Sequence, residues 1–164
     1  MSDSAKTEET SQTYEAGCHC GHVKLSVTLT PSLQTYKVLN CNCSICRRLG
    51  YLLVYPTYDE VTWHDGSKEK CSKYEVRPFA PPESRGEKNR ELAFNSLQFN
   101  TKTRDHLFCP KCGASIGIDF QRLGKLKYGI NVRTFDGIDL DKIQLEKFDG
   151  LKELTPHEDS SSGR

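Results

Sequence analysis

The sequence predicts an all-β domain whose cysteines lie on loops between strands, and three observations support this fold class. Apolar and polar residues alternate in several short segments, a period of two that is typical of half-buried strands. Helical patterns are scarce, and the clearest is one short turn over residues 44–48 that Ser44 would cap. Seven of the eight cysteines fall into three tight groups, which flank the strand segments.

The strand patterns occur in six segments. Alternation is clearest over residues 23–29, where four aliphatic residues alternate with polar ones. The others are short apolar or alternating runs: 52–55, 61–63, 72–77, 116–120 and 126–132. In the last of them the even-numbered residues are apolar, so we expect Asn131 and Arg133 to project from the opposite face, away from the core.

The length of 164 residues fits one domain flanked by two tails. Residues 1–13 and 155–164 are almost free of large apolar side chains, so we expect both tails to be disordered. A single β domain would then span residues 14–154. Within it, the charged segment 78–90 is rich in proline and glycine, and is interpreted as a binding loop, a lid or a solvated insertion without function.

Charge and hydropathy exclude several classes of protein. The net charge is +1, with 23 basic and 22 acidic residues, which argues against a nucleic-acid partner. No run of 18 apolar residues predicts a membrane span, and the N-terminus lacks the apolar region of a secretory signal. We therefore expect a cytoplasmic protein with reduced thiols. Eight cysteines would also allow a disulfide framework, but their Cys-X-Cys and Cys-X-X-Cys spacings are those of zinc ligands.

Two of the cysteine groups together supply the ligands of a closed zinc site. One residue separates Cys18 from Cys20, so on a strand both would project from the same face. The spacing of Cys109 and Cys112 is that of a zinc knuckle. Four thiolates complete the tetrahedron of a structural zinc ion. Because the two pairs lie far apart in the sequence, such a zinc would tie an early strand to a late one.

The third group supplies three thiols, Cys41, Cys43 and Cys46. Three protein ligands leave the fourth position of a zinc ion open, which is typical of catalytic sites. Three thiolates on a divalent ion leave a net negative charge, which favours binding another thiolate over generating hydroxide. We therefore predict a thiol substrate. Arg48, together with Arg47, could hold a carboxylate of that substrate or stay solvated.

Two other interpretations of this group remain open. A fourth protein ligand, such as Cys71, His64 or His106, would make the site structural. Alternatively, the three thiols could form a redox cluster.

The cysteine motifs resemble those of the glutathione-dependent formaldehyde-activating enzymes, a family that also includes centromere protein V. The resemblance runs from about Tyr14 to Phe148. It rests on four motifs, Gly17-Cys18-His19-Cys20-Gly21, Cys41-Asn42-Cys43-Ser44-Ile45-Cys46-Arg47, His106-Leu107-Phe108-Cys109-Pro110-Lys111-Cys112-Gly113 and Asn131-Val132-Arg133.

This resemblance implies a β-tent fold with two zinc ions. Cys18, Cys20, Cys109 and Cys112 would hold the structural zinc, and Cys41, Cys43 and Cys46 would hold a labile catalytic zinc. The implied activity is the reversible addition of glutathione to formaldehyde, which is that of a carbon–sulfur lyase. Apart from the resemblance, Asn131 and Arg133 could bind the carboxylates or amides of glutathione from the face opposite the core, and Arg48 could hold a carboxylate. Arg133 could instead form a salt bridge or a hydrogen bond at a strand edge.

Two features depart from the family's pattern, namely the longer 78–90 segment and Cys71. Related thiol adducts, such as those of secondary metabolism, are therefore alternative substrates. A non-enzymatic zinc-binding interaction module and a purely structural scaffold with two zinc ions are the competing hypotheses.

Overall fold

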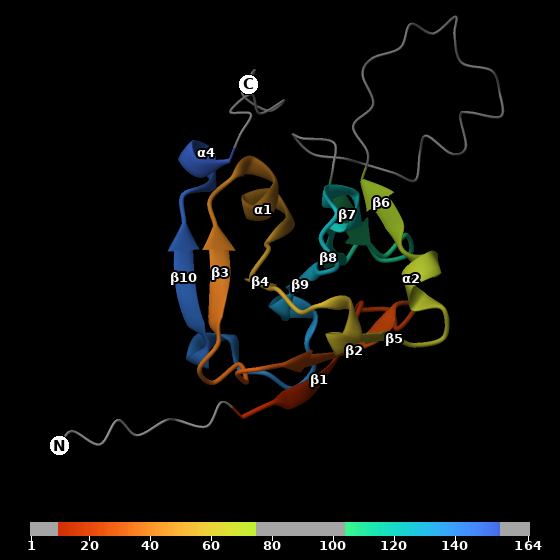
Figure 1. Ribbon diagram of the computed structural model, residues 1–164. Helices are drawn as coiled ribbons and strands as arrows, with labels where there is room; N and C mark the ends of the chain where they lie inside the picture. Colours follow the sequence, from red (N-terminus) through yellow and green to blue (C-terminus); the bar gives the residue numbers. More distant parts are fainter. Residues whose placement is uncertain (1–9, 75–103, 155–164) are drawn as a thin grey trace, which may run out of the picture.

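The computed structural model describes residues 10–74 and 104–154, and in this part of the chain two β-sheets carry the fold (Figure 1). The smaller sheet has three antiparallel strands in the order β1-β2-β5. Their bounds are Gln12–Gly17 for β1, Lys24–Leu29 for β2 and Val61–Trp63 for β5.

The larger sheet has seven strands in the order β10-β3-β4-β9-β8-β7-β6. Its edge strand β10 pairs in parallel with β3, and the other pairs are antiparallel. In chain order the strands are β3 (Lys37–Cys41), β4 (Leu53–Val54), β6 (Ser72–Tyr74), β7 (Asp105–Phe108), β8 (Ser115–Asp119), β9 (Tyr128–Asn131) and β10 (Gln144–Phe148).

The helices of the described residues are short. The α-helices are α1 (Ser44–Leu49), α2 (Ser67–Lys70) and α4 (Gly150–Glu153). Single 3-10 turns are η1 (Tyr58–Glu60), η3 (Gln121–Leu123), η4 (Val132–Thr134) and η5 (Leu140–Lys142). The predicted all-β fold class is therefore confirmed. No helix in residues 10–74 or 104–154 has the length and apolar character that a membrane crossing needs.

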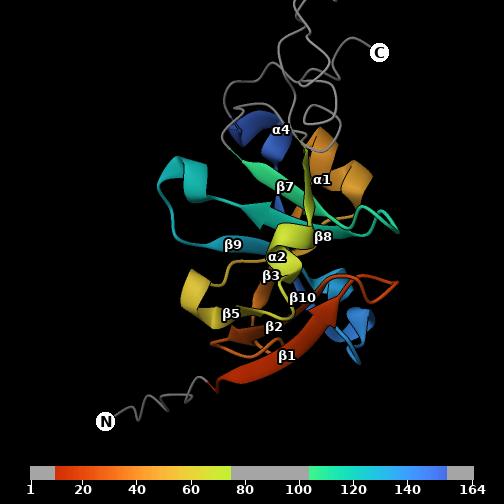
Figure 2. The same ribbon diagram turned by 90° about the vertical axis from the view of Figure 1, so that its right-hand side faces the viewer.

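The main core lies between the two sheets, which Figure 2 shows one above the other. Leu25 and Val27 of β2 are fully buried there with Val54 of β4 and Ile130 of β9. A second apolar cluster surrounds the three cysteines near α1 and includes Ile118 at the far end of β8. The alternation predicted for residues 23–29 is thus confirmed, because one face of β2 packs against the larger sheet.

Several expectations from the sequence need correction. The strand predicted over 126–132 is limited to β9, and all four of its residues are buried, so both faces of the sheet are covered at this strand. Asn131 is only 3% exposed, so the expectation that it faces away from the core is wrong. Arg133 is exposed, but from the turn η4 rather than from a strand. The N-cap of α1 is Cys43, not Ser44.

Strands β1, β3, β7 and β10 were not apparent from the sequence pattern. The tails before residue 10 and after residue 154, and the 78–90 segment, lie outside the described residues.

Gly117 is predicted to be essential for the pairing of β8 with β9. A Cβ atom at this position would clash with the carbonyl oxygen of Gly129 and lie 3.1 Å from the Cα atom of Ile130. Because these are backbone atoms of the paired strand, Gly117→Ala should lower the free energy of unfolding by about 2–3 kcal/mol or more. Urea denaturation measures this change.

The control is Leu126→Ala, since Leu126 is 67% exposed and its truncation should change stability by at most about 0.5 kcal/mol. Equal denaturation midpoints for the two variants would contradict the structure of this strand pair.

Candidate metal centres

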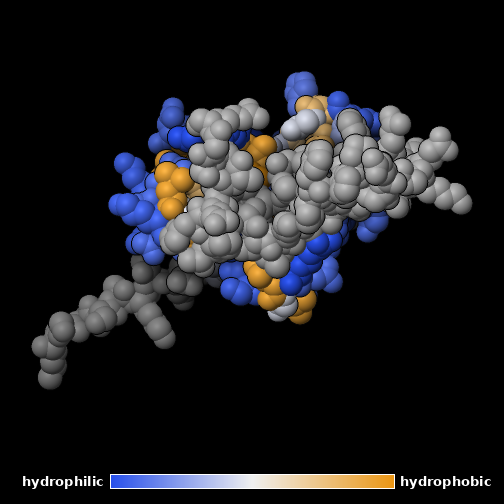
Figure 3. All heavy atoms as spheres, turned by 90° about the horizontal axis from the view of Figure 1, so that it is seen from above, coloured by the Kyte–Doolittle hydropathy of each residue, from blue (hydrophilic) through white to orange (hydrophobic). Residues whose placement is uncertain are grey.

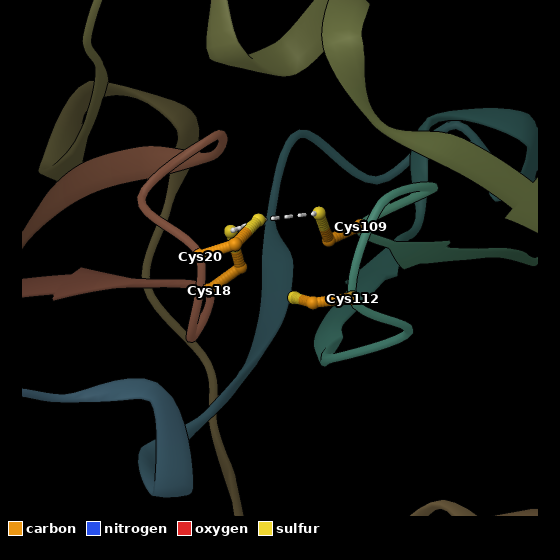
Figure 4. A group of neighbouring side chains, drawn as sticks. All are labelled: Cys18, Cys20, Cys109 and Cys112. Atoms are coloured by element: carbon orange, nitrogen blue, oxygen red, sulfur yellow. Dashed lines mark hydrogen bonds between the residues drawn. The ribbon is translucent and has the colours of Figure 1, made fainter.

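The first candidate metal centre joins the two sheets. Cys18 and Cys20 follow β1, whereas Cys109 and Cys112 follow β7, and their side chains converge (Figure 4). All four sulfur atoms lie within 4.8 Å of one another. The Sγ atom of Cys20 is 3.6 Å from that of Cys18 and 3.7 Å from that of Cys109. Thiolates at about 2.3 Å from a tetrahedral ion lie about 3.8 Å apart, so the four sulfurs fit one ion.

Backbone amides favour the thiolate form of two of these cysteines. Burial raises the pKa of Cys18, but the Val23 amide, 3.2 Å from its sulfur, and neighbouring thiols more than offset this and lower it. The amides of Ala114 and Cys20 lower the pKa of Cys112 to about 6. Because the thiolate is the form that binds metals, both turns are prepared for an ion.

Each of these turns requires a glycine directly after its last cysteine. Gly21 and Gly113 have φ angles of 71° and 74°, in the left-handed region that side chains disfavour. The amide of Gly113 donates to the carbonyl oxygen of Cys109 at 2.9 Å, and the amide of Gly21 donates to that of Cys18 at 3.0 Å. These bonds close both loops around the sulfur atoms.

The second candidate metal centre consists of three buried cysteines at the junction of β3 and α1. Cys41 ends β3, Cys43 caps α1, and Cys46 lies in the helix. Their sulfur atoms lie within 4.8 Å of one another, and within the described residues no fourth Cys, His, Asp or Glu joins them. The sequence therefore located both clusters correctly, and all eight cysteines are free thiols.

The three proposed sources of a fourth ligand lie apart from this cluster. The Cys71 thiol donates to the carbonyl oxygen of Ser67 at 3.3 Å, and it packs against the main core. The Nε2 atom of His64 lies 2.5 Å from the hydroxyl of Ser26, in the smaller sheet. His106 lines the same cavity as the cluster but is not part of it.

The three thiols share their protons unequally. Hydrogen bonds from the thiols of Cys41 and Cys46 lower the pKa of Cys43. The thiol of Cys43 raises the pKa of Cys41, and the thiols of Cys41 and Cys43 raise the pKa of Cys46. Within this cluster the thiolate form is therefore favoured most at Cys43.

A cavity of about 240 Å³ adjoins the three cysteines. Its lining includes residues of β3, α1 and β8 and the residue that follows α4. Among the coloured residues on the face seen from above, Figure 3 shows hydrophobic residues next to hydrophilic ones. Most of its walls are apolar or aromatic, and these residues are Leu39, Ile45, Leu53, Tyr55, Ile118, Phe120, Leu123, Phe148 and Leu154. The cavity is thus continuous with the second apolar cluster.

Three cations also line the cavity, and two of them are held by aromatic rings. Nζ of Lys127 lies 4.9 Å from the ring centroid of Tyr55 and 5.8 Å from that of Phe120. The guanidinium carbon of Arg104 lies 6.0 Å from the same Phe120 centroid, and Lys125 completes the group. Among the described residues no carboxylate lines the cavity. The cations are therefore suited to bind an anionic group.

His106 and Tyr51 form a buried polar pair beside the cavity. Their rings stack at 5.8 Å, and the Tyr51 hydroxyl donates to the carbonyl oxygen of Gly117 at 3.1 Å. The same hydroxyl lies 3.3 Å from Nδ1 of His106, which can donate to it. Burial lowers the pKa of His106 to about 4, so the imidazole is neutral at neutral pH.

The residues predicted to bind substrate do not line this cavity. Arg48 donates from Nη1 to the carbonyl oxygen of Ser44 at 3.1 Å, and Arg133 donates from Nε to that of Gly50 at 2.9 Å. Asn131 accepts from the amides of Leu52 and Arg133 and donates to the carbonyl oxygen of Ser115. These contacts support the backbone around α1, β4 and β8.

The cations at the cavity are instead Arg104, Lys125 and Lys127, which sequence reasoning missed. In the sequence, the only indication of this group of cations is that Lys125 and Lys127 are separated by a single residue.

The C-terminal segment packs directly on the cluster. The side chain of Asn42 donates to a carboxylate oxygen of Asp149 at 2.8 Å and accepts from the amide of Leu151 at 3.1 Å. Gly150 lies so close that a Cβ atom there would clash with Sγ of Cys41 and lie 3.0 Å from Cβ of Cys43. This contact brings Leu154 to the cavity wall.

Comparison with known proteins supports the fold alone. No family model matches the chain, and no curated protein matches it. A solved structure that resembles it is the crystal structure of a Rhodobacter sphaeroides protein, a Northeast Structural Genomics target. The TM-score is 0.56 at 24% sequence identity, over 80% of this chain and 99% of the other. An all-β chain with two cysteine clusters that could hold metal ions is therefore the class that fold and sites define.

Cys109→Ser should destabilise the protein far more than Cys71→Ser does. Cys109 is fully buried and contributes one of four sulfurs that join the sheets, so its loss should lower the free energy of unfolding by more than about 3 kcal/mol. Cys71 lies outside both clusters, and a serine there can keep the bond to Ser67, so the cost should be about 1 kcal/mol at most. Denaturation of metal-loaded protein measures both, and similar losses would refute a stabilising role for the first cluster.

Gly150→Ala should impair the second cluster selectively. The added methyl group must displace Cys41 or the α4 backbone, so the affinity of the three cysteines for metal should fall by about tenfold or more. Metal titration with a chromogenic chelator measures this change. Leu151→Ala, in the same helix at an exposed site, is the control and should keep both metals. Loss of the first metal in Gly150→Ala would show that the two clusters are not independent.

Proposed function

We propose that this protein is a zinc-dependent carbon–sulfur lyase that adds a thiol, such as glutathione, reversibly to an aldehyde. The observation that carries the proposal is the second cluster, in which three buried thiols without a fourth ligand among the described residues open onto a cavity. The first cluster would hold a structural zinc ion, and Cys41, Cys43 and Cys46 would hold a labile catalytic one.

The donor sets fit zinc. Thiolates are soft ligands that select zinc, copper(I) or iron–sulfur clusters, and four thiolates in tetrahedral spacing are typical of structural zinc. When bound at the three cysteines, zinc would supply an open position at which a substrate thiol is held as its thiolate.

The cavity residues would orient the rest of the substrate. Glutathione is an anionic thiol, and its carboxylates would pair with Arg104, Lys125 or Lys127 while its sulfur points to the cysteines. Positioning both reactants in one cavity lowers the entropic part of the barrier. The neutral imidazole of His106 lines the cavity, and Tyr51, which stacks on it, would help to exclude water from this side.

The reaction needs no oxidant or reductant. In the forward direction a bond forms between the thiol sulfur and the aldehyde carbon, and the electron pair of the carbonyl π bond moves to oxygen. The proton that leaves sulfur ends on that oxygen, which yields a hemithioacetal. The reverse reaction breaks the carbon–sulfur bond.

Cys43→Ser should abolish thiol-dependent turnover while the fold and the first metal survive. Cys43 contributes the central sulfur of the second cluster, so its replacement should lower turnover of glutathione with formaldehyde at least about a hundredfold. Native mass spectrometry should find two zinc ions in the natural protein. Addition of glutathione should displace one of them or change its binding. The variant should retain a single zinc ion.

Cys71→Ser is the matched control and should behave as the natural protein does. Two inert zinc ions that ignore glutathione would instead favour a structural scaffold, and full turnover by Cys43→Ser would exclude the role proposed for this cluster.

A further inference from the structure

The cavity beside the three cysteines is more apolar than glutathione and formaldehyde require. Formaldehyde has two heavy atoms and no apolar group, so it cannot cover the leucine and phenylalanine side chains of the lining. Glutathione is polar along its whole length, so its peptide groups match the cations but leave the apolar walls without a partner.

The apolar walls are continuous and partly open. Leu39, Phe148 and Leu154 come from β3, β10 and the end of α4, and Ile118 and Phe120 come from the β8 side. Leu39, Phe148 and Leu154 are only partly buried against the cluster of Cys41, Cys43 and Cys46, so part of their surface stays accessible. In Figure 1, α4 and β10 stand on one side of this space and β7 and β8 on the other.

The cations occupy a different part of the lining from Leu39, Phe148 and Leu154. Arg104 and Lys127 are both held against Phe120, on the β8 side. The wall from β10 and α4 contributes Phe148 and Leu154, with no charged side chain. A molecule that spans the cavity therefore meets cations on the β8 side and hydrocarbon on the side of β10 and α4, where the cluster of three cysteines also packs.

We propose that the carbonyl substrate of this site carries an apolar or aromatic group of several carbons, which packs against Leu39, Phe148 and Leu154. This inference rests on the proposed function and names its substrate class, an anionic thiol combined with a bulky apolar aldehyde. Atoms balance as for any aldehyde, because the carbon–sulfur bond forms while the thiol proton moves to the carbonyl oxygen. The apolar group itself takes no part in the bond changes.

Inert thioethers of glutathione test this assignment without turnover. Isothermal titration calorimetry of the zinc-loaded, full-length protein would compare S-benzylglutathione with S-methylglutathione. We expect the benzyl compound to bind at least tenfold more tightly, because only its ring can cover the apolar wall. Leu154→Asn should reduce this ratio to near one. Leu151→Asn, at an exposed position of the same helix, should leave the ratio unchanged.

Each outcome decides between the two proposals. Equal affinities of the two thioethers would overturn the apolar substrate class while leaving a glutathione site in place. Failure of both to bind, while glutathione itself binds, would overturn this inference alone, and failure of glutathione to bind as well would overturn the proposed function with it. A benzyl preference that persists in Leu154→Asn would also overturn the assignment, because the ring would then bind elsewhere.

Discussion

The convergence of four cysteines from two sheets is the constraint on which the rest of the structure depends. The smaller sheet contributes the turn between β1 and β2, and the larger sheet contributes the turn between β7 and β8. Only 35% of the residues are hydrophobic, so a shared metal ion would supply stability that a lean core lacks. The sulfur spacings already match such an ion, which means that packing and ligand geometry agree.

This link also positions the cavity. It fixes the start of β8, and the opposite end of the same strand delivers Ile118, followed by Phe120, to the cavity wall. A metal ion at the first cluster would hold the sheets together, so the second cluster would not need to stabilise the fold. The three thiols at the junction of β3 and α1 could then remain an incomplete donor set, which would leave a position for a substrate ligand. Under the proposed function, stability and reactivity would then depend on different cysteines.

The two cysteine clusters could be predicted from the sequence because the spacing of metal ligands within each motif is local. Cys-X-Cys and Cys-X-X-Cys pairs reach one ion whatever the rest of the fold does, and the alternation of β2 needs only one buried face. Asn131 was placed wrongly because alternation assigns faces only where one side meets solvent, whereas β9 is covered on both sides. Edge strand β10 was not apparent, since four of its five residues are exposed and its pairing with β3 is long-range.

The cations of the cavity, like Asn131 and β10, could not be predicted from the sequence. They also explain how the site could accept its substrate. Arg104 precedes β7 while Lys125 and Lys127 follow β8, so only the pairing of these strands brings them together. Three thiolates on a divalent ion carry one net negative charge, and a fourth thiolate raises it to two. Such a charge is costly in an apolar cavity unless cations lie near. Aromatic rings hold Lys127 and Arg104 in place, so a thiolate would enter a site whose positive charges are already positioned.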